Sequence, residues 1–439
     1  MGGFVCPPEW FVLGLYPPVW AGVAMVVVRC VVWPIPSLFE TWRSRVATWS
    51  GLTRTVVAVA LITRVVVLGV GLAASFVDPN RLAPAPRISE NPVVTLPARW
   101  DAFWYLDIAR YGYHWNAGHD DEQQDIAFFP GYPLAMRVAG DIVTIPAYLL
   151  NLPNLLGGGD GRVIWGGVAA SWLFFVLALS RIHRLAWQDT RDASAAARSC
   201  ILLASYPFAI FFTAPYSESL ALFALASLVL AWRRDDARAG TVWGLLFGLC
   251  RSNGWCVAFA LAADWIAGRS RGSKRRRAAM WMAIAAAPLG AVLYSVYIYH
   301  LTGHPLAWAA AQHAWGGRLQ PLNFVTRRWD AVQLRGLRGY YHHDPVDAWS
   351  FVAAAVMTTA AVVLLVRRQW LYGVLVVAYL APAIAIDLPA TGRMTALLFP
   401  AFILLGKRFR GAAFVALAAV FTVGQIWFAW RFFLWRTPY

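Results

Sequence analysis

The chain has 439 residues, of which 59% are hydrophobic and only 14% are charged. Soluble domains contain about 45–50% apolar and about 25% charged residues, so this composition excludes a soluble globular protein and predicts contact with lipid. The net charge of +16 does not indicate nucleic-acid binding, because the basic residues concentrate in short connectors between apolar runs. Such connectors are typical of the cytoplasmic side of a membrane protein.

Residues 1–40 combine six prolines with a short apolar run that carries Arg29. This pattern fits neither a signal peptide nor a membrane span. Two interpretations stay open, a weak additional helix or a translation start placed too early. We therefore treat 1–40 as an N-terminal extension and expect one integral-membrane domain over 41–439.

Several later apolar runs approach the roughly 20 residues that a helix needs to cross a bilayer. Among them are Thr55–Val77, Val163–Ala186, Ala279–Leu301, Phe351–Val366 and Ala412–Phe433. Further crossings are expected over Ala196–Pro215, Leu220–Trp232, Leu371–Ile386 and Met394–Leu405, with a short hairpin or surface-lying helix over Phe128–Leu156. The sequence thus predicts an all-α polytopic membrane protein of about 10–12 transmembrane helices, with extracytoplasmic loops over 78–127 and 301–347.

The loop 78–127 carries an aromatic-rich segment with a carboxylate in it. Apolar side chains recur at helical spacing after Pro97, which predicts a helix lying in the membrane interface with its aromatic face among the headgroups. Asp101 stands near the start of that helix. It is either an N-cap without chemistry or an ionised carboxylate that accepts a proton.

Successive membrane spans must cross in opposite directions. Followed along the chain, this rule places three more polar segments between apolar runs on the same outer face. They are the tip with Glu218, the turn Arg251–Gly254 between two halves of Ala239–Ile266, and the tip that ends at Arg393. An arginine at such a depth is costly unless it pairs with an acid or a phosphate. Two interpretations of Arg251 follow, a phosphate ligand or a structural partner of Glu218 or Asp101, and Glu218 itself could be a simple first-turn acid.

Four segments in this order resemble the PIG-V family, the second mannosyltransferase of GPI-anchor assembly, and its bacterial relatives. They are Arg99-Trp100-Asp101-Ala102, Ala127-Phe128-Phe129-Pro130-Gly131-Tyr132-Pro133-Leu134, Tyr216-Ser217-Glu218-Ser219-Leu220 and Arg251-Ser252-Asn253-Gly254. The resemblance covers roughly residues 55–270. The C-terminal third matches only in hydropathy and in a loose Arg393…Pro400 pattern, and residues 1–40 have no counterpart.

The resemblance implies a GT-C-like bundle with its active-site loop on the extracytoplasmic face. Such an enzyme would transfer mannose from polyprenyl-phosphate-mannose to a lipid- or glycan-linked acceptor by inverting single displacement. In this scheme Asp101 is the catalytic base and Arg251 and Arg393 hold the donor phosphate. The residues expected to line the site are Trp100, Phe129, Tyr132, Tyr216, Glu218 and Asn253.

The lipid-linked sugar is then a co-substrate, and no cofactor is expected. No metal is expected either, because one phosphodiester does not strictly need a divalent ion and no metal-ligand spacing stands out. The expected partners are membrane lipids, the polyprenyl-phosphate donor and the acceptor, without nucleic acid. Many alanines and arginines with few lysines indicate the plasma membrane of a high-GC bacterium. A bacterium that makes no GPI would need a different acceptor, so the family's acceptor does not transfer.

Two other classes of protein remain as alternatives. A transporter or flippase of a lipid-linked sugar would explain broken helices without any base, although the internal inverted repeats that would favour it are not seen. A catalytically dead scaffold of the cell envelope is disfavoured by the intact Trp100-Asp101 pair.

Overall fold

The computed structural model describes residues 51–77, 88–89, 91–118, 122–149, 156, 158–268, 274–315, 319–320 and 322–436. All regular structure in this part of the chain is helical, without a strand. The elements are α3 (Gly51–Val77), α4 (Pro92–Thr95), α5 (Ala102–Tyr111), η3 (Asp125–Ala127), α6 (Gly131–Leu149), α7 (Gly159–Thr190), α8 (Ala193–Ser205), η5 (Pro207–Phe212), α9 (Glu218–Arg233), α10 (Ala237–Cys250), η6 (Gly254–Cys256), α11 (Val257–Ile266), α12 (Lys274–Thr302), α13 (Ala307–Ala311), η7 (Gln312–Trp315), α14 (Asn323–His343), α15 (Pro345–Val366), α16 (Trp370–Ala385), α17 (Thr391–Thr395), α18 (Phe399–Arg408) and α19 (Gly411–Phe433). The extension 1–40 lies outside the described residues.

Five helices are long and apolar enough to cross a membrane, judged by length and composition. They lie at Arg54–Val77, Gly159–Thr190, Met280–Thr302, Pro345–Val366 and Gly411–Phe433, and they match five of the predicted runs. Shorter apolar helices occur at Ala193–Ser205, Ala237–Cys250, Gly254–Ile266 and Trp370–Ala385. The prediction of an all-α membrane protein is confirmed. The figure of 10–12 crossings stays a prediction, since it requires shorter helices to cross as well.

Two expected segments differ in the structure, and in a third one of two alternatives is favoured. Among the described residues of 128–156, Gly131–Leu149 form the helix α6, which packs against α7, so these residues fit the expected helix better than the hairpin. The outgoing run 196–215 stops at Ser205 and continues as η5, because a residue before proline, here Tyr206 before Pro207, avoids the helical region and is extended at φ −57° and ψ 139°. The run 394–405 is likewise divided into α17 and α18.

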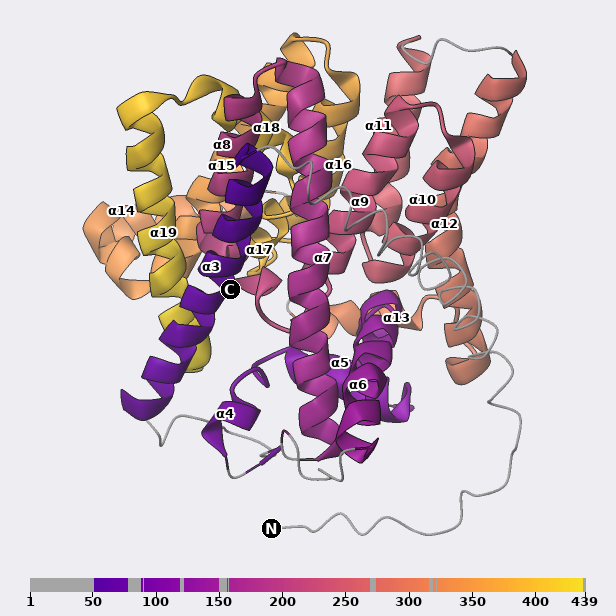
Figure 1. Cartoon of the computed structure of the whole chain (residues 1–439), viewed down its shortest axis with the longest axis vertical. Coiled ribbons are helices and arrows are strands. Elements are labelled where there is room, and N and C mark those ends of the chain that lie inside the picture. Colours follow the sequence, from indigo (N-terminus) through magenta and orange to yellow (C-terminus); the bar gives the residue numbers. More distant parts are fainter. Residues whose placement is uncertain are drawn as a thin grey trace. The chain divides into compact units, whose positions relative to one another are not determined.

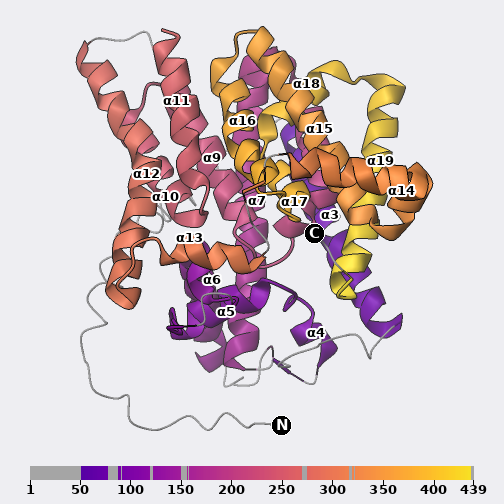
Figure 2. The same cartoon turned by 180° about the vertical axis from the view of Figure 1, so that it is seen from behind.

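Helix α9 forms part of the core of the bundle. Every residue from Glu218 to Trp232 is buried, which is the behaviour of a helix that is hydrophobic all round. It packs against α7 on one side and α10 on the other. Both views show α9 enclosed by neighbouring helices, with α10 and α12 side by side (Figures 1 and 2).

Close contact between α10 and α12 depends on a glycine. A Cβ at Gly248 would lie 2.1 Å from the backbone oxygen of Ala287, so a larger residue must push the two helices apart. After α10 the chain turns sharply: Arg251 is extended at φ −150° and ψ 145°, and α11 begins six residues later, at Val257. The predicted break between two short helices is confirmed.

The aromatic face of α5 is partly covered by protein, and its placement among lipid headgroups stays a prediction. Trp104 stacks on Phe128 at 6.0 Å between ring centroids and meets Trp315 edge-on at 6.0 Å. Ile108 is buried, whereas Tyr111 at the end of the helix is exposed. The segment 301–347, expected as a loop, contains α13, η7 and α14, and η7 supplies Trp315 to this aromatic cluster.

Candidate active site

Asp101 immediately precedes α5, but it does not cap the helix. The Asp101 side chain makes no capping hydrogen bond, so the interpretation as a simple N-cap is wrong. Its backbone N–H donates to the Tyr216 hydroxyl at 3.0 Å, and that hydroxyl donates to the Arg99 carbonyl at 3.0 Å. The preceding residue, Trp100, has φ +53°, a left-handed conformation that is uncommon outside glycine and is found at functional sites. The backbone around Asp101 is therefore held by Tyr216, and the carboxylate is left for other partners.

The partner of the Asp101 carboxylate is Arg393. Arg393 Nη1 lies 2.5 Å from Asp101 Oδ2, and its Nε donates to Glu218 Oε1. Arg251 Nη1 donates to the same Glu218 oxygen at 2.6 Å. We call these four residues, Asp101, Glu218, Arg251 and Arg393, the ion cluster.

The ion cluster is almost completely enclosed. Glu218 is 0% exposed, Arg393 6%, Asp101 7% and Arg251 8%. Two guanidinium groups face two carboxylates, so the charges balance, as buried charges must if their desolvation is to be compensated.

Four separate stretches of the chain supply these side chains. Asp101 precedes α5, Glu218 is the first residue of α9, Arg251 stands at the turn after α10, and Arg393 lies in α17. The sequence predicted that these four segments meet at one place, and the ion pairs show that they do.

Aromatic rings and a serine complete the surroundings of the ion cluster. The Arg393 guanidinium lies 4.6 Å from the ring centroid of Tyr216 and 4.9 Å from that of Phe211, where cation–π attraction operates. Ser217 accepts hydrogen bonds from Arg251 at 3.3 Å and from the Tyr105 hydroxyl at 3.0 Å.

Sequence reasoning missed Tyr105, Phe211 and Ser217 as neighbours of the ion cluster. For two of them the sequence contained information that could have identified them. Tyr105 follows Asp101 by four residues and so faces the same side of α5, and Ser217 precedes Glu218. Phe211 carried none, because it is one of many aromatic residues in an apolar run.

Of the predicted lining residues, Glu218 belongs to the ion cluster and Tyr216 contacts it, while Trp100 and Tyr132 serve as supports. Trp100 donates from its ring nitrogen to the Phe432 carbonyl at 3.2 Å and so joins the start of α5 to the end of α19. The Tyr132 ring meets Tyr105 edge-on at 5.1 Å, one layer behind the ion cluster.

Phe129 and Asn253 lie further out. The Phe129 ring contacts Tyr294 at 4.5 Å and Trp308 at 5.0 Å, which makes it part of a wall formed with α12 and α13. Asn253 belongs to the turn that carries Arg251, and its carbonyl accepts from the Cys256 N–H at 3.1 Å. Among the residues that the structure describes, neither side chain has a hydrogen bond to the ion cluster.

Both arginines keep hydrogen-bonding capacity for a further anion. Arg393 uses Nε and Nη1, and its Nη2 has no hydrogen-bond partner in the described part of the chain. Arg251 Nη2 has Met394 Sδ at 3.0 Å, and a thioether is a weak acceptor that a phosphate oxygen would outcompete. The arrangement can thus hold an anionic group next to a carboxylate that is able to take a proton.

A family model described as Mannosyltransferase (PIG-V) matches residues 53–269. That range contains Asp101, Glu218 and Arg251, three members of the ion cluster. This part of the chain, just under half of its length, is similar to the PIG-V mannosyltransferase family. Arg393 lies outside the matched range but reaches the PIG-V region through its contacts with Asp101 and Glu218.

Curated relatives carry the corresponding names. The chain is 26% identical over 328 residues to GPI alpha-1,6-mannosyltransferase 2 of Rattus norvegicus, covering 67% of this chain and 62% of that protein. It is 28% identical over 220 residues to GPI mannosyltransferase 2 of Drosophila pseudoobscura pseudoobscura, covering 45% and 46% of the two chains. It is 30% identical over 182 residues to the human GPI alpha-1,6-mannosyltransferase 2, covering 40% and 34%. The chain thus spans less than two thirds of the length of these relatives.

Similarity to solved structures is distant. An example is the archaeal oligosaccharyltransferase AglB from Archaeoglobus fulgidus, with 13% identity and a TM-score of 0.45, over 89% of this chain and 56% of that chain. This similarity is too distant to support an argument about the site.

Proposed function

We propose that this protein is a membrane mannosyltransferase that takes mannose from polyprenyl-phosphate-mannose and attaches it to a hydroxyl of a lipid- or glycan-linked acceptor. The observation that carries the proposal is the enclosed ion cluster, three of whose residues fall in the PIG-V region. The reaction takes place on the extracytoplasmic face of a bacterial plasma membrane. The membrane lipids, the donor and the acceptor are its partners.

Asp101 acts as the general base in this proposal. Its ion pair with Arg393 fixes the position of the carboxylate, so that it can accept the proton of the acceptor hydroxyl. As it loses its proton, the acceptor hydroxyl oxygen attacks the anomeric carbon of mannose. The bond between that carbon and the phosphate oxygen breaks at the same time. A single displacement of this kind inverts the anomeric configuration.

Arg393 and Arg251 stabilise the leaving phosphate. The donor carries one negative charge as a phosphodiester, and the departing polyprenyl phosphate gains a second while Asp101 loses its own to the incoming proton. The total charge beside the arginines stays constant, and the negative charge moves from Asp101 to the phosphate. Arg393 already contacts Asp101 and would lie next to the donor phosphate. It can therefore stabilise the negative charge at both positions without a change in its own conformation.

One assay tests the proposal and separates it from transport. Purified protein is incubated with radiolabelled polyprenyl-phosphate-mannose and a membrane lipid extract, and a parallel sample receives labelled GDP-mannose. We expect label in the acceptor fraction with the lipid-linked donor only. Label from GDP-mannose alone would contradict the donor assignment. Movement of the lipid-linked sugar across vesicles without any transfer would favour a flippase.

A further inference from the structure

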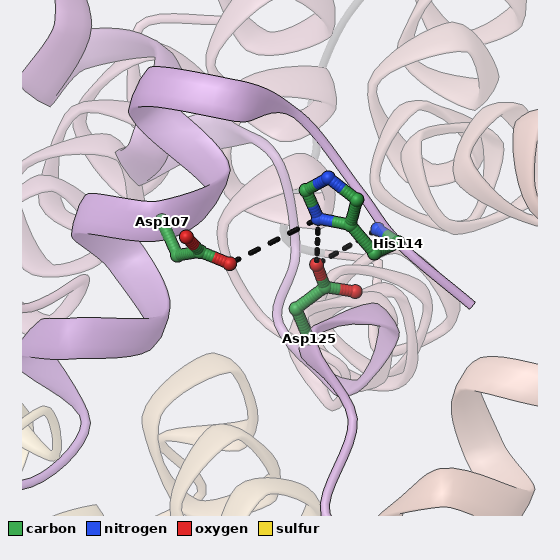
Figure 3. A group of neighbouring side chains, drawn as sticks. All are labelled: Asp107, His114 and Asp125. Carbon is green, nitrogen blue, oxygen red and sulfur yellow. Dashed lines mark hydrogen bonds and ion pairs between the residues drawn. The ribbon is translucent and has the colours of Figure 1, made fainter. Parts of the chain in front are cut away.

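A second group of polar side chains lies at the other end of α5, away from the ion cluster. Asp107 belongs to α5, His114 follows the end of that helix, and Asp125 is the first residue of η3. One ligand atom of each residue lies within 4.8 Å of the other two. Figure 3 shows the three side chains pointing toward one another, with His114 between the two carboxylates.

The distances within this group are close to those of a metal site. His114 Nδ1 lies 3.4 Å from Asp125 Oδ2 and 3.9 Å from Asp107 Oδ2. Around an ion with bonds of about 2.0–2.2 Å, adjacent ligand atoms are roughly 3 Å apart. The side chains of Asp107 and His114 are 48% and 60% exposed, so small rotations can close the remaining gap.

The surroundings of Asp125 are a separate indication that a positive charge belongs at this place. Its side chain is 3% exposed, and its Oδ1 is buried without a hydrogen-bond partner among the residues that the structure describes. Its Oδ2 accepts the backbone N–H of His114 at 2.8 Å, which orients the carboxylate toward the imidazole.

We propose that Asp107, His114 and Asp125 bind a divalent transition-metal ion such as Mn²⁺ or Zn²⁺. One imidazole nitrogen with two carboxylates is a donor set suited to these ions, whereas oxygen ligands alone suit Mg²⁺ and Ca²⁺. Water completes the coordination on the exposed side.

The ion would fasten the loop after α5 to α5 itself. The same helix begins next to Asp101, so the bound metal would stiffen the support of the ion cluster without entering it. The inference does not depend on the proposed transfer reaction, because none of its three ligands belongs to the ion cluster.

The test uses the purified full-length protein in detergent, stripped with a chelator that is then removed. Mn²⁺ is added, free Mn²⁺ is followed by electron paramagnetic resonance, and the melting temperature is recorded in parallel. We expect one bound equivalent and a raised melting temperature, since a ligand that binds only the folded state stabilises it. His114→Ala and Asp107→Asn, both at partly exposed side chains that the fold tolerates, should each weaken binding about tenfold or more.

Two matched controls replace exposed residues of the same types in α14. His343→Ala and Asp330→Asn should bind Mn²⁺ like the unchanged protein. The inference fails if the unchanged protein binds neither Mn²⁺ nor Zn²⁺, or if His114→Ala and Asp107→Asn bind as well as the controls. It also fails if Asp101→Asn abolishes binding, because the ion would then belong to the ion cluster.

Discussion

Arg393 is the residue that joins the two acids of the ion cluster. Its guanidinium bonds Asp101 through Nη1 and Glu218 through Nε, and a second arginine shares Glu218. A single ammonium group could not hold both carboxylates in this fixed geometry. The ion cluster therefore depends on the planar shape of guanidinium as much as on its charge.

Arg251 offers a prediction that separates binding from structure. Arg251→Lys keeps a positive charge for Glu218 but loses the fork that we propose for the donor phosphate. We expect the apparent KM for the lipid-linked donor to rise about tenfold, a loss of roughly 1.4 kcal/mol, with little change in melting temperature. Steady-state kinetics and thermal unfolding of the same preparation measure both.

The opposite pattern would assign Arg251 a structural role. An unchanged donor KM together with a large loss of thermal stability would mean that Arg251 serves only to neutralise Glu218. Arg410→Lys is a suitable control, because Arg410 is largely exposed and makes a loose contact of 3.9 Å with Asp192.

The acids and arginines of this site could be found from sequence, and Glu218 was one of two partners expected for Arg251, but the contacts of Arg393 could not be predicted. A charged residue between apolar runs must find a partner, which singled out Arg251 and Arg393. That Arg393 would reach both Asp101 and Glu218 depends on contacts between positions 175 and 292 residues apart in the chain. Spacing along one sequence carries no information on such contacts.

At the scale of elements, the turn after α10 is positioned by the contact between α10 and α12. We expect Gly248→Ala to lower the melting temperature and to raise the donor KM, because the new Cβ would meet the Ala287 backbone and displace the helix that leads to Arg251. Gly69→Ala is the matched control. A Cβ there meets nothing within 4 Å, so a neutral or slightly stabilising effect is expected. Equal behaviour of the two variants would show that α10 does not position the site.

The elements also show which sequence signals were sufficient. Long apolar runs located α3, α7, α12, α15 and α19, because hydropathy over some 20 residues is a strong signal. Short interruptions between helices were harder to predict from the sequence. The division between α8 and η5 follows from Pro207, yet the surrounding residues are uniformly apolar and gave no sign of two separate pieces. The aromatic face of α5 fitted lipid headgroups and a protein interior equally well.

For the whole molecule, the proposed reaction requires that the ion cluster lie on the extracytoplasmic side of the membrane. In a protein whose Cys6 and Cys30 are replaced by serine, a cysteine at the exposed position Asn116 should react with an impermeant thiol reagent in intact cells. A cysteine at the exposed position Arg238 should react only after permeabilisation. The native Cys200 is buried and should not react with the reagent. Labelling of position 238 from outside would overturn the topology.

The central claim is that Asp101 takes the proton of the acceptor, and its direct test is the turnover of Asp101→Asn. Asparagine keeps the size of the side chain and can still accept a hydrogen bond from Arg393, but it cannot act as the base. We predict a fall in kcat of about 10²–10⁴-fold, with membrane insertion and donor KM close to those of the exposed-site control Asp330→Asn. The melting temperature should fall below that of the control, because Arg393 loses a charged partner inside the enclosed cluster. Turnover of Asp101→Asn near that of the unchanged protein would contradict the account and place the base elsewhere.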